Sequence, residues 1–173
     1  MQARELALHE ILLPVKTAFI VFTFIAALLV NLLPWSGWWL AFKPDFVALV
    51  VLYWCILQPR KVGFTSAWVL GLIMDVAEGS LFGQHALAYS VLAFGGIVLH
   101  RRVLMFSIRD QVLHVLVLLL LNDLLVLVIR MLAGAGFPGF EYFLGSLTAA
   151  ALWPALSFLF KLPQRPPPDP DRV

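Results

Sequence analysis

Asp123 and Arg130 stand in and just after a long apolar stretch of this sequence, where charged side chains are rare. They are seven residues apart, about two helical turns, so on a helix they would present an acid and a base on one face. An ion pair of Arg130 with Asp75 or Asp123 would make the arginine tolerable there. The other polar side chains in or beside apolar stretches are Asn31, Asp75, Glu78, Gln84, His85 and Asn122.

Polar groups at membrane depth are costly, so each of these residues is a functional candidate. Three interpretations stay open. The side chains could cap helices, pair and hold helices together. They could form a pocket, open to the external side, for a small polar ligand or a lipid headgroup. They could relay protons or ions, which is disfavoured because no acidic residue stands at equivalent depth in the inner half.

Catalytic and metal-binding motifs are absent from the sequence. His9-Glu10 is followed by Ile11-Leu12-Leu13, which lacks the second histidine of a zinc-binding motif. The single cysteine, Cys55, excludes an intrachain disulfide and a multi-cysteine metal site. Ser146 has no base nearby in sequence, so we expect a structural role for it. We expect no enzymatic activity, no catalytic residue, no cofactor and no bound metal.

The elements that position these residues follow from the composition. Hydrophobic residues make up 62% of the 173 residues and charged residues 13%, and mean hydropathy is +0.94. Soluble domains contain about 45–50% apolar and about 25% charged residues. These values exclude an ordinary soluble enzyme, a disordered chain and a nucleic-acid-binding protein with a basic face. They indicate an all-α integral membrane protein.

Six apolar runs are candidate transmembrane spans: 17–33, 46–57, 63–76, 86–99, 112–129 and 142–160. The second, third and fourth are shorter than the ~20 residues that cross a bilayer. Charge favours six crossings with both termini cytoplasmic, because only Lys43 and Arg130 then lie outside, among twelve basic residues. We expect one transmembrane domain, 1–162, followed by an unstructured Pro-rich cytoplasmic tail, 163–173.

Two further sets of residues are candidates for contacts. Small residues in the third and sixth runs are typical of close helix packing or of a face for a partner helix. These are Gly63, Ala67, Gly71, Gly145 and Ala149. Basic residues in the cytoplasmic turns could contact anionic lipid headgroups or a partner. These are Arg60, Lys61, Arg101, Arg102 and Arg109.

The central part of the chain resembles a known family. The residues that carry the likeness are Lys43-Pro44-Asp45-Phe46, Tyr53-Trp54 and the segment from Gly71 to Leu87, which reads GLIMDVAEGSLFGQHAL. The sequence from about Pro14 to Phe160 is similar to the MreD family of rod shape-determining membrane proteins. The resemblance implies a multi-pass protein of the bacterial inner membrane. It also implies a six-helix bundle similar to the S components of energy-coupling-factor transporters.

The same resemblance implies a function and partners. It predicts a non-enzymatic scaffold of the elongasome that binds MreC directly and helps control lateral peptidoglycan synthesis and rod cell shape. RodA, its penicillin-binding transpeptidase and MreB would be contacted directly or through MreC, with membrane lipids as further partners. The alternative is an S-component-like protein that binds a small ligand or lipid in a pocket open to the periplasm. Whether the protein forms a homodimer stays open.

Overall fold

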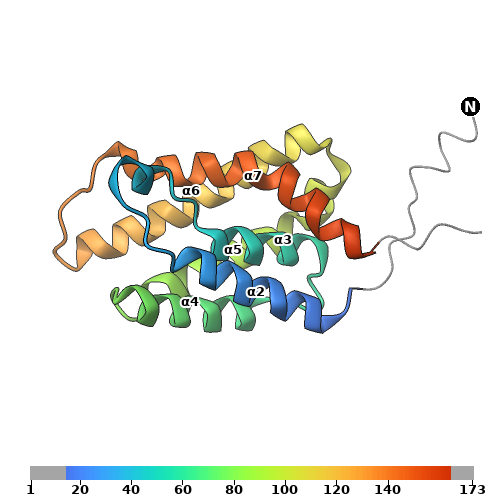
Figure 1. Ribbon diagram of the computed structural model, residues 1–173, viewed down its shortest axis with the longest axis horizontal. Helices are drawn as coiled ribbons and strands as arrows, with labels where there is room; N and C mark the ends of the chain where they lie inside the picture. The colour runs from blue at the N-terminus through green and yellow to red at the C-terminus, as the bar shows by residue number, and fades with distance from the viewer. Residues whose placement is uncertain (1–14, 165–173) are drawn as a thin grey trace, which may run out of the picture.

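A computed structural model describes residues 15–164, and every regular element in that range is helical. The long helices run roughly along the long axis of the molecule (Figure 1). In chain order the elements are α2 (Thr17–Asn31), η1 (Gly37–Phe42), α3 (Phe46–Leu57), α4 (Phe64–Glu78), α5 (Gln84–Met105), α6 (Ile108–Leu132), η2 (Phe140–Phe143), α7 (Leu144–Lys161) and η3 (Leu162–Gln164).

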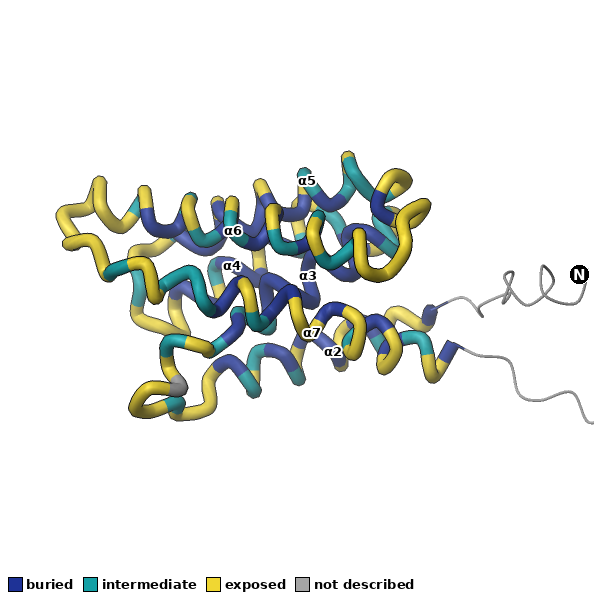
Figure 2. The backbone as a smooth tube through the Cα atoms, turned by 90° about the horizontal axis from the view of Figure 1, so that it is seen from above, coloured by how far each residue is buried: buried dark blue, intermediate teal, exposed yellow. Residues whose placement is uncertain are grey.

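The helix α3 forms the centre of the core. Every residue from Val47 to Ile56 is buried, and the helix packs against α2, α5, α6 and α7 (Figure 2). Its 12 residues are only about 18 Å long. Because neighbouring helices cover it, the length of α3 does not have to match the thickness of the bilayer. This explains why its sequence is a continuous apolar run instead of an amphipathic pattern.

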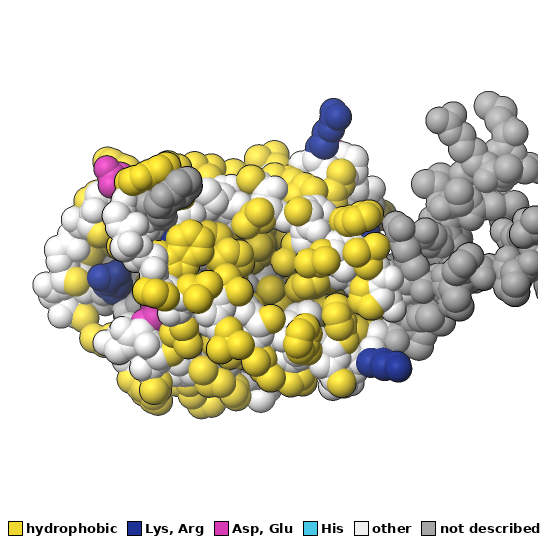
Figure 3. Space-filling model, viewed as in Figure 1, with side chains coloured by type: hydrophobic (Ala, Val, Ile, Leu, Met, Phe, Trp, Pro, Cys, Tyr) yellow, Lys and Arg dark blue, Asp and Glu magenta, His cyan; other side chains and the backbone are white. Residues whose placement is uncertain are grey.

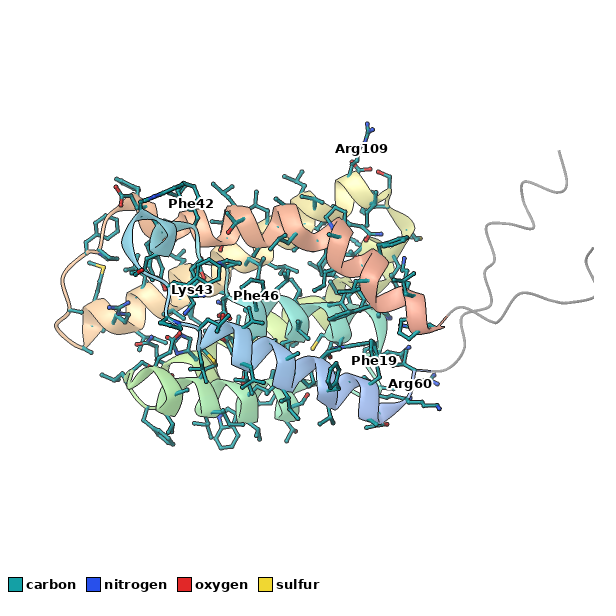
Figure 4. All side chains as sticks on the ribbon, in the orientation of Figure 1. Phe19, Phe42, Lys43, Phe46, Arg60 and Arg109 are labelled. Atoms are coloured by element: carbon teal, nitrogen blue, oxygen red, sulfur yellow. The ribbon has the colours of Figure 1, made fainter. Side chains whose placement is uncertain are left out.

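Aromatic rings close the core at one end of α3. The Tyr53 ring lies 5.0 Å from that of Trp54 and 5.1 Å from that of Phe160 on α7. Trp54 and Phe160 stack with their centroids 5.7 Å apart, and Trp54 Nε1 donates to Thr23 Oγ1 at 2.9 Å. These contacts join α2, α3 and α7 at the end of the bundle near Phe19 and Arg60 (Figure 4).

The outward faces of the helices are apolar, as a bilayer requires. Hydrophobic side chains cover most of the middle of the face in Figure 3. Four segments of the described chain are long and apolar enough to cross a membrane: Leu40–Leu57, Gln84–Met105, Ile108–Leu132 and Phe140–Gln164. The prediction of an all-α membrane protein is confirmed. The six crossings and the cytoplasmic location of both termini stay predictions, since α2 and α4 have 15 residues each, about 22 Å.

Several helices extend beyond the apolar runs that predicted them. The run 86–99 corresponds to α5, which continues through Arg101 and Arg102 to Met105. Where a helix leaves the bilayer it no longer needs apolar side chains. Hydropathy therefore locates the segment inside the membrane but does not show where the helix ends. At the other extreme α3 coincides with the predicted run 46–57. The expected tail, 163–173, lies outside the described residues except for Pro163 and Gln164.

Basic residues gather at one end of the bundle. Arg60, Lys61, Arg101, Arg102 and Arg109 are all exposed. Figure 4 places Arg60 and Arg109 toward the end of the long axis opposite Lys43. Lys61 Nζ also donates to the backbone carbonyl of Val15, which ties the α3–α4 turn to the start of α2. The polar candidates described next lie toward the Lys43 end, so the two groups of polar residues are well separated.

Candidate functional site

Asp45 joins three helices at the start of α3. Its Oδ1 caps α3 by accepting from Ala48 N at 3.0 Å and also accepts from Asn31 Nδ2 at 3.3 Å. Its Oδ2 accepts from the Tyr89 hydroxyl of α5 at 2.6 Å. Asn31 Oδ1 in turn accepts from Phe46 N at 3.2 Å. Sequence reasoning selected Asn31 but neither Asp45 nor Tyr89, although an aspartate just before an apolar run is a helix-capping signal.

Asp75 holds the turn between α4 and α5. Its side chain is buried, and its oxygens accept from Gly83 N at 2.8 Å and from His85 N at 2.8 Å. Ser80 Oγ donates to Oδ1 at 3.0 Å, and His85 Nδ1 lies 2.9 Å from the same oxygen. The carboxylate thus satisfies backbone amides at the N-terminus of α5, where negative charge is favourable. Asp75 therefore stabilises the α4–α5 turn, a role that could not be inferred from the sequence.

The imidazole of His85 connects Asp75 to a half-exposed acid. His85 Nε2 lies 3.7 Å from Glu78 Oε2, and Glu78 Oε1 lies 3.8 Å from Lys43 Nζ. Ser80, His85 and Asp75 resemble a hydrolase triad in composition only. Both Ser80 Oγ and Asp75 Oδ1 contact the same ring nitrogen, Nδ1, at 3.3 and 2.9 Å. A triad requires the serine and the acid on opposite nitrogens, so this group cannot activate Ser80 as a nucleophile.

Asp123 links α6 to α7. Ser146 Oγ donates to Asp123 Oδ2, and Asn122 Nδ2 lies 3.4 Å from Asp123 Oδ1. Asn122 is 4% exposed, and its Oδ1 atom is buried without a hydrogen-bond partner in the described chain. An unpaired buried carbonyl oxygen is costly, and because Oδ1 itself is enclosed, a donor in the cavity reaches it only when the amide turns toward the cavity.

These side chains surround a cavity of about 140 Å³, here called the acid cavity because the carboxylates of Asp45, Glu78 and Asp123 line it. That volume is that of roughly four to five water molecules, at about 30 Å³ each. Pockets for drug-sized ligands measure about 300–1,000 Å³. The acid cavity by itself is therefore smaller than such pockets. Its further lining residues are Asn31, Lys43, Pro44, His85, Leu119, Asn122, Val126, Tyr142, Gly145, Ser146 and Ala149.

A second cavity of about 480 Å³, here called the vestibule, adjoins the first. The two share Glu78, His85, Val126 and Tyr142 as walls. Gln84 and Arg130 line the vestibule but not the acid cavity. The expected ion pair of Arg130 with Asp75 or Asp123 is wrong, because no carboxylate within residues 15–164 lies within 4 Å of its guanidinium. Two turns of α6 separate Arg130 from Asp123, and Asp75 is enclosed by its own turn.

The predicted polar residues thus divide by location. Asn31, Glu78, His85, Asn122 and Asp123 line the acid cavity, and Asp75 supports it from behind His85. No three histidine, cysteine or acidic residues in the described part of the chain are close enough to hold a metal ion. The carboxylates around the cavity therefore act as separate acceptors.

The small residues serve contacts inside the chain. A Cβ on Gly71 would lie 2.4 Å from Ala86 Cα, and one on Gly145 would lie 2.5 Å from the Lys43 carbonyl oxygen. Ala67 and Ala149 are buried, and Gly63 is half-buried with Ile97 at its nearest approach. A partner helix cannot reach the buried members of this set. Of the two roles considered for these small residues, the contacts within the chain favour close helix packing over a face for a partner helix.

An apolar groove of about 680 Å³ is lined by residues of α2, α3 and α7 and is here called the lateral groove. Its lining from α2 repeats at helical spacing, so one face of that helix forms a wall. Among the lining side chains only Thr23 is polar. The residues are Phe19, Phe22, Thr23, Ala26, Ala27 and Val30 of α2, Phe46 and Val50 of α3, and Leu156, Leu159, Phe160, Leu162 and Pro163 at the other wall.

Comparison with known proteins decides the family. The family model described as rod shape-determining protein MreD matches residues 14–162. This chain belongs to the MreD family. Over 142 residues it is 30% identical to the Rod shape-determining protein MreD of Haemophilus influenzae, covering 80% of this chain and 85% of the relative. No solved structure matches.

Membership of the MreD family gives the chain a role in cell shape as part of the shape-determining system. The family is a structural one and not a known enzyme family. The expected likeness to S components stays a prediction.

Proposed function

We propose that this MreD-family chain is a non-enzymatic scaffold in the bacterial inner membrane that binds MreC and helps control lateral peptidoglycan synthesis. The observation that carries the role is family membership over residues 14–162. Between residues 15 and 164 the chain consists of helices and short connections. Partners that bind this part of the chain therefore meet helix surfaces within the bilayer or short segments at its two faces. RodA, its penicillin-binding transpeptidase and MreB associate with it directly or through MreC.

The lateral groove is the surface that fits a single transmembrane helix of MreC. In a bilayer, helices associate through close packing, because lipid tails are as apolar as leucine. Ala26 and Ala27 supply small side chains in the α2 wall, while Phe19, Phe22 and Phe46 supply large ones around them. This alternation of small and large side chains gives a partner helix both close approach and a shaped surface. The buried glycines of α4 and α7 offer no such access.

The experiment fills the groove. In Ala26→Phe the added ring occupies the groove, and we expect MreC recovered with this chain to fall about tenfold, equivalent to about 1.4 kcal/mol of lost binding. Ala151→Phe is the matched control, because Ala151 is exposed on α7 and does not line the groove. Both variants are coexpressed with MreC from the same genome, purified in nanodiscs and weighed by native mass spectrometry.

Full recovery of MreC with a folded Ala26→Phe variant would place the MreC contact elsewhere on the molecule. The measured masses also give the number of copies of each chain, so a homodimer is detected in the same experiment. The transporter-like alternative predicts a retained small molecule that Asp123→Ala releases. The acid cavity alone is smaller than a pocket for a vitamin-sized ligand, and the adjoining vestibule adds about 480 Å³.

A further inference from the structure

The acid cavity has an excess of negative charge and an unused acceptor. Three carboxylates line it, those of Asp45, Glu78 and Asp123, against one lysine, Lys43. Lys43 is 3.8 Å from Glu78, which leaves Asp123 with hydroxyl and amide neighbours but no cation among the described residues. The buried Asn122 Oδ1 beside it accepts no hydrogen bond. Both features favour a positively charged hydrogen-bond donor.

A primary ammonium group fits these acceptors better than a metal ion does. No three metal-ligating side chains in residues 15–164 converge closely enough to bind a metal. An ammonium group has three donors that point in different directions, so it can use separate acceptors such as Asp123 and, when the amide turns toward the cavity, Asn122 Oδ1. It also fits a volume of about 140 Å³. A trimethylated ammonium is larger and has no donor at all.

The vestibule supplies the complementary charge. Arg130 lines it, is exposed, and has no carboxylate of the described chain within 4 Å. Guanidinium groups bind phosphate through paired hydrogen bonds. Arg130 and Asp123 are about 10 Å apart along α6, and the Arg130 side chain is long enough to close much of that distance. An anion position and a cation position therefore adjoin, which suits a zwitterion.

The rim of the vestibule is apolar and exposed. Leu81, which lines the vestibule, is 53% exposed, and its neighbour Phe82 is 72% exposed. Exposed leucine and phenylalanine around a polar cavity match a molecule with a polar head and hydrocarbon chains.

We infer that the acid cavity and the vestibule together bind a phosphoethanolamine headgroup. The ammonium occupies the acid cavity against Asp123 and Asn122 Oδ1, and the phosphate occupies the vestibule against Arg130. The source is an aminophospholipid whose chains leave over Leu81 and Phe82. Free phosphoethanolamine shares the same chemistry. This inference does not depend on MreC binding.

The test compares two lipids with identical acyl chains. The full-length chain in detergent is titrated with dioleoyl phosphatidylethanolamine or dioleoyl phosphatidylcholine and followed by native mass spectrometry. We expect the ethanolamine lipid to bind about tenfold more tightly, because choline cannot donate to Asp123 and Asn122. Asp123→Asn should reduce binding of the ethanolamine lipid to near that of the choline lipid. Arg130→Gln should weaken both lipids, and Arg109→Gln, at the opposite end, should weaken neither.

Equal binding of the two lipids by the unaltered chain would overturn the inference, and this result requires no variant to fold. A folded Asp123→Asn variant that keeps the preference for ethanolamine would also overturn it. Competition with soluble phosphoethanolamine distinguishes the sources. If soluble phosphoethanolamine displaces the lipid, the site recognises the headgroup alone and the free compound is a ligand. If the lipid stays bound, its acyl chains contribute to binding and the ligand comes from the membrane.

Discussion

Two carboxylates, Asp45 and Asp75, act at the residue scale as anchors for backbone. Asp45 accepts from Ala48 N, and Asp75 accepts from Gly83 N and His85 N. Each carboxylate sits at the start of a helix whose first amides have no partner inside the helix. Asp75 is buried and Asp45 is half-buried, and both positions are tolerated because every carboxylate oxygen accepts a hydrogen bond. An acid that fixes a turn in this manner is poorly suited to exchange protons during a reaction.

Asp75→Asn tests this assignment. The amide group keeps the shape of the side chain but replaces one acceptor oxygen by a donor, which faces backbone N–H groups. We expect the free energy of unfolding to fall by about 2 kcal/mol. The measurement is unfolding in detergent, with the exposed Glu141→Gln as control. Equal stability of Asp75→Asn and the unaltered chain would show that the turn does not depend on this carboxylate.

Tyr89→Phe isolates one hydrogen bond to Asp45. The hydroxyl is 2.6 Å from Asp45 Oδ2 and joins α5 to the start of α3. Its removal leaves Asp45 with its bonds to Ala48 and Asn31, so we expect a loss of about 1.5 kcal/mol. The same unfolding assay measures it. A loss below the precision of that assay would indicate that solvent replaces the hydroxyl.

At the element scale, the close approach of α4 to α5 depends on Gly71. A Cβ there would lie 2.4 Å from Ala86 Cα, a backbone atom that no side-chain rotation can move away. The two helices are also joined by Asp75 and the short turn after Gly79. Contact between these helices therefore sets the position of His85 and of one wall of the acid cavity.

Gly71→Ala should separate α4 from α5. We expect a loss of stability of about 1–3 kcal/mol from overpacking. Gly136→Ala is the matched control, because nothing lies within 4 Å of the added carbon and its backbone does not have positive φ. Thermal unfolding of the two variants in detergent gives the comparison. Equal melting temperatures would mean that α4 and α5 adjust without cost.

At the scale of the whole molecule, the basic end and the polar cavities lie at opposite ends of the bundle. Positive residues favour the cytoplasmic side of a membrane. We therefore predict that Arg60, Arg101, Arg102 and Arg109 lie on the cytoplasmic side and that the acid cavity faces the periplasm. The lateral groove runs along the side between these ends, where a partner helix can enter from the bilayer.

Cysteine labelling tests this orientation. The native Cys55 is fully buried and should not react. Cysteine at Gly136 should react with a membrane-impermeant maleimide added to spheroplasts, whereas cysteine at Arg60 or Arg109 should react only after permeabilisation. If a cysteine at position 109 reacted with the maleimide in sealed spheroplasts, the basic end would face the periplasm and the predicted orientation would be wrong.

The sequence by itself determined the membrane class, the helical character and the approximate place of each helix. Long apolar runs report helix position directly, because the bilayer selects hydrophobic side chains along the whole span. The run 46–57 became α3 without change. Their places in or beside apolar runs also made Asp75, His85 and Asp123 candidates, and a functional role for them stays a prediction.

Only the tertiary structure decided which of these groups meet. Asp123 and Arg130 share a face of α6 yet line different cavities, while Asp75 and His85, ten residues apart, are in contact. Asp45 and Tyr89 are joined across 44 residues. The lateral groove likewise arises from helices far apart in the chain. Such contacts depend on how helices pack and turn about one another, and hydropathy carries no information about that geometry.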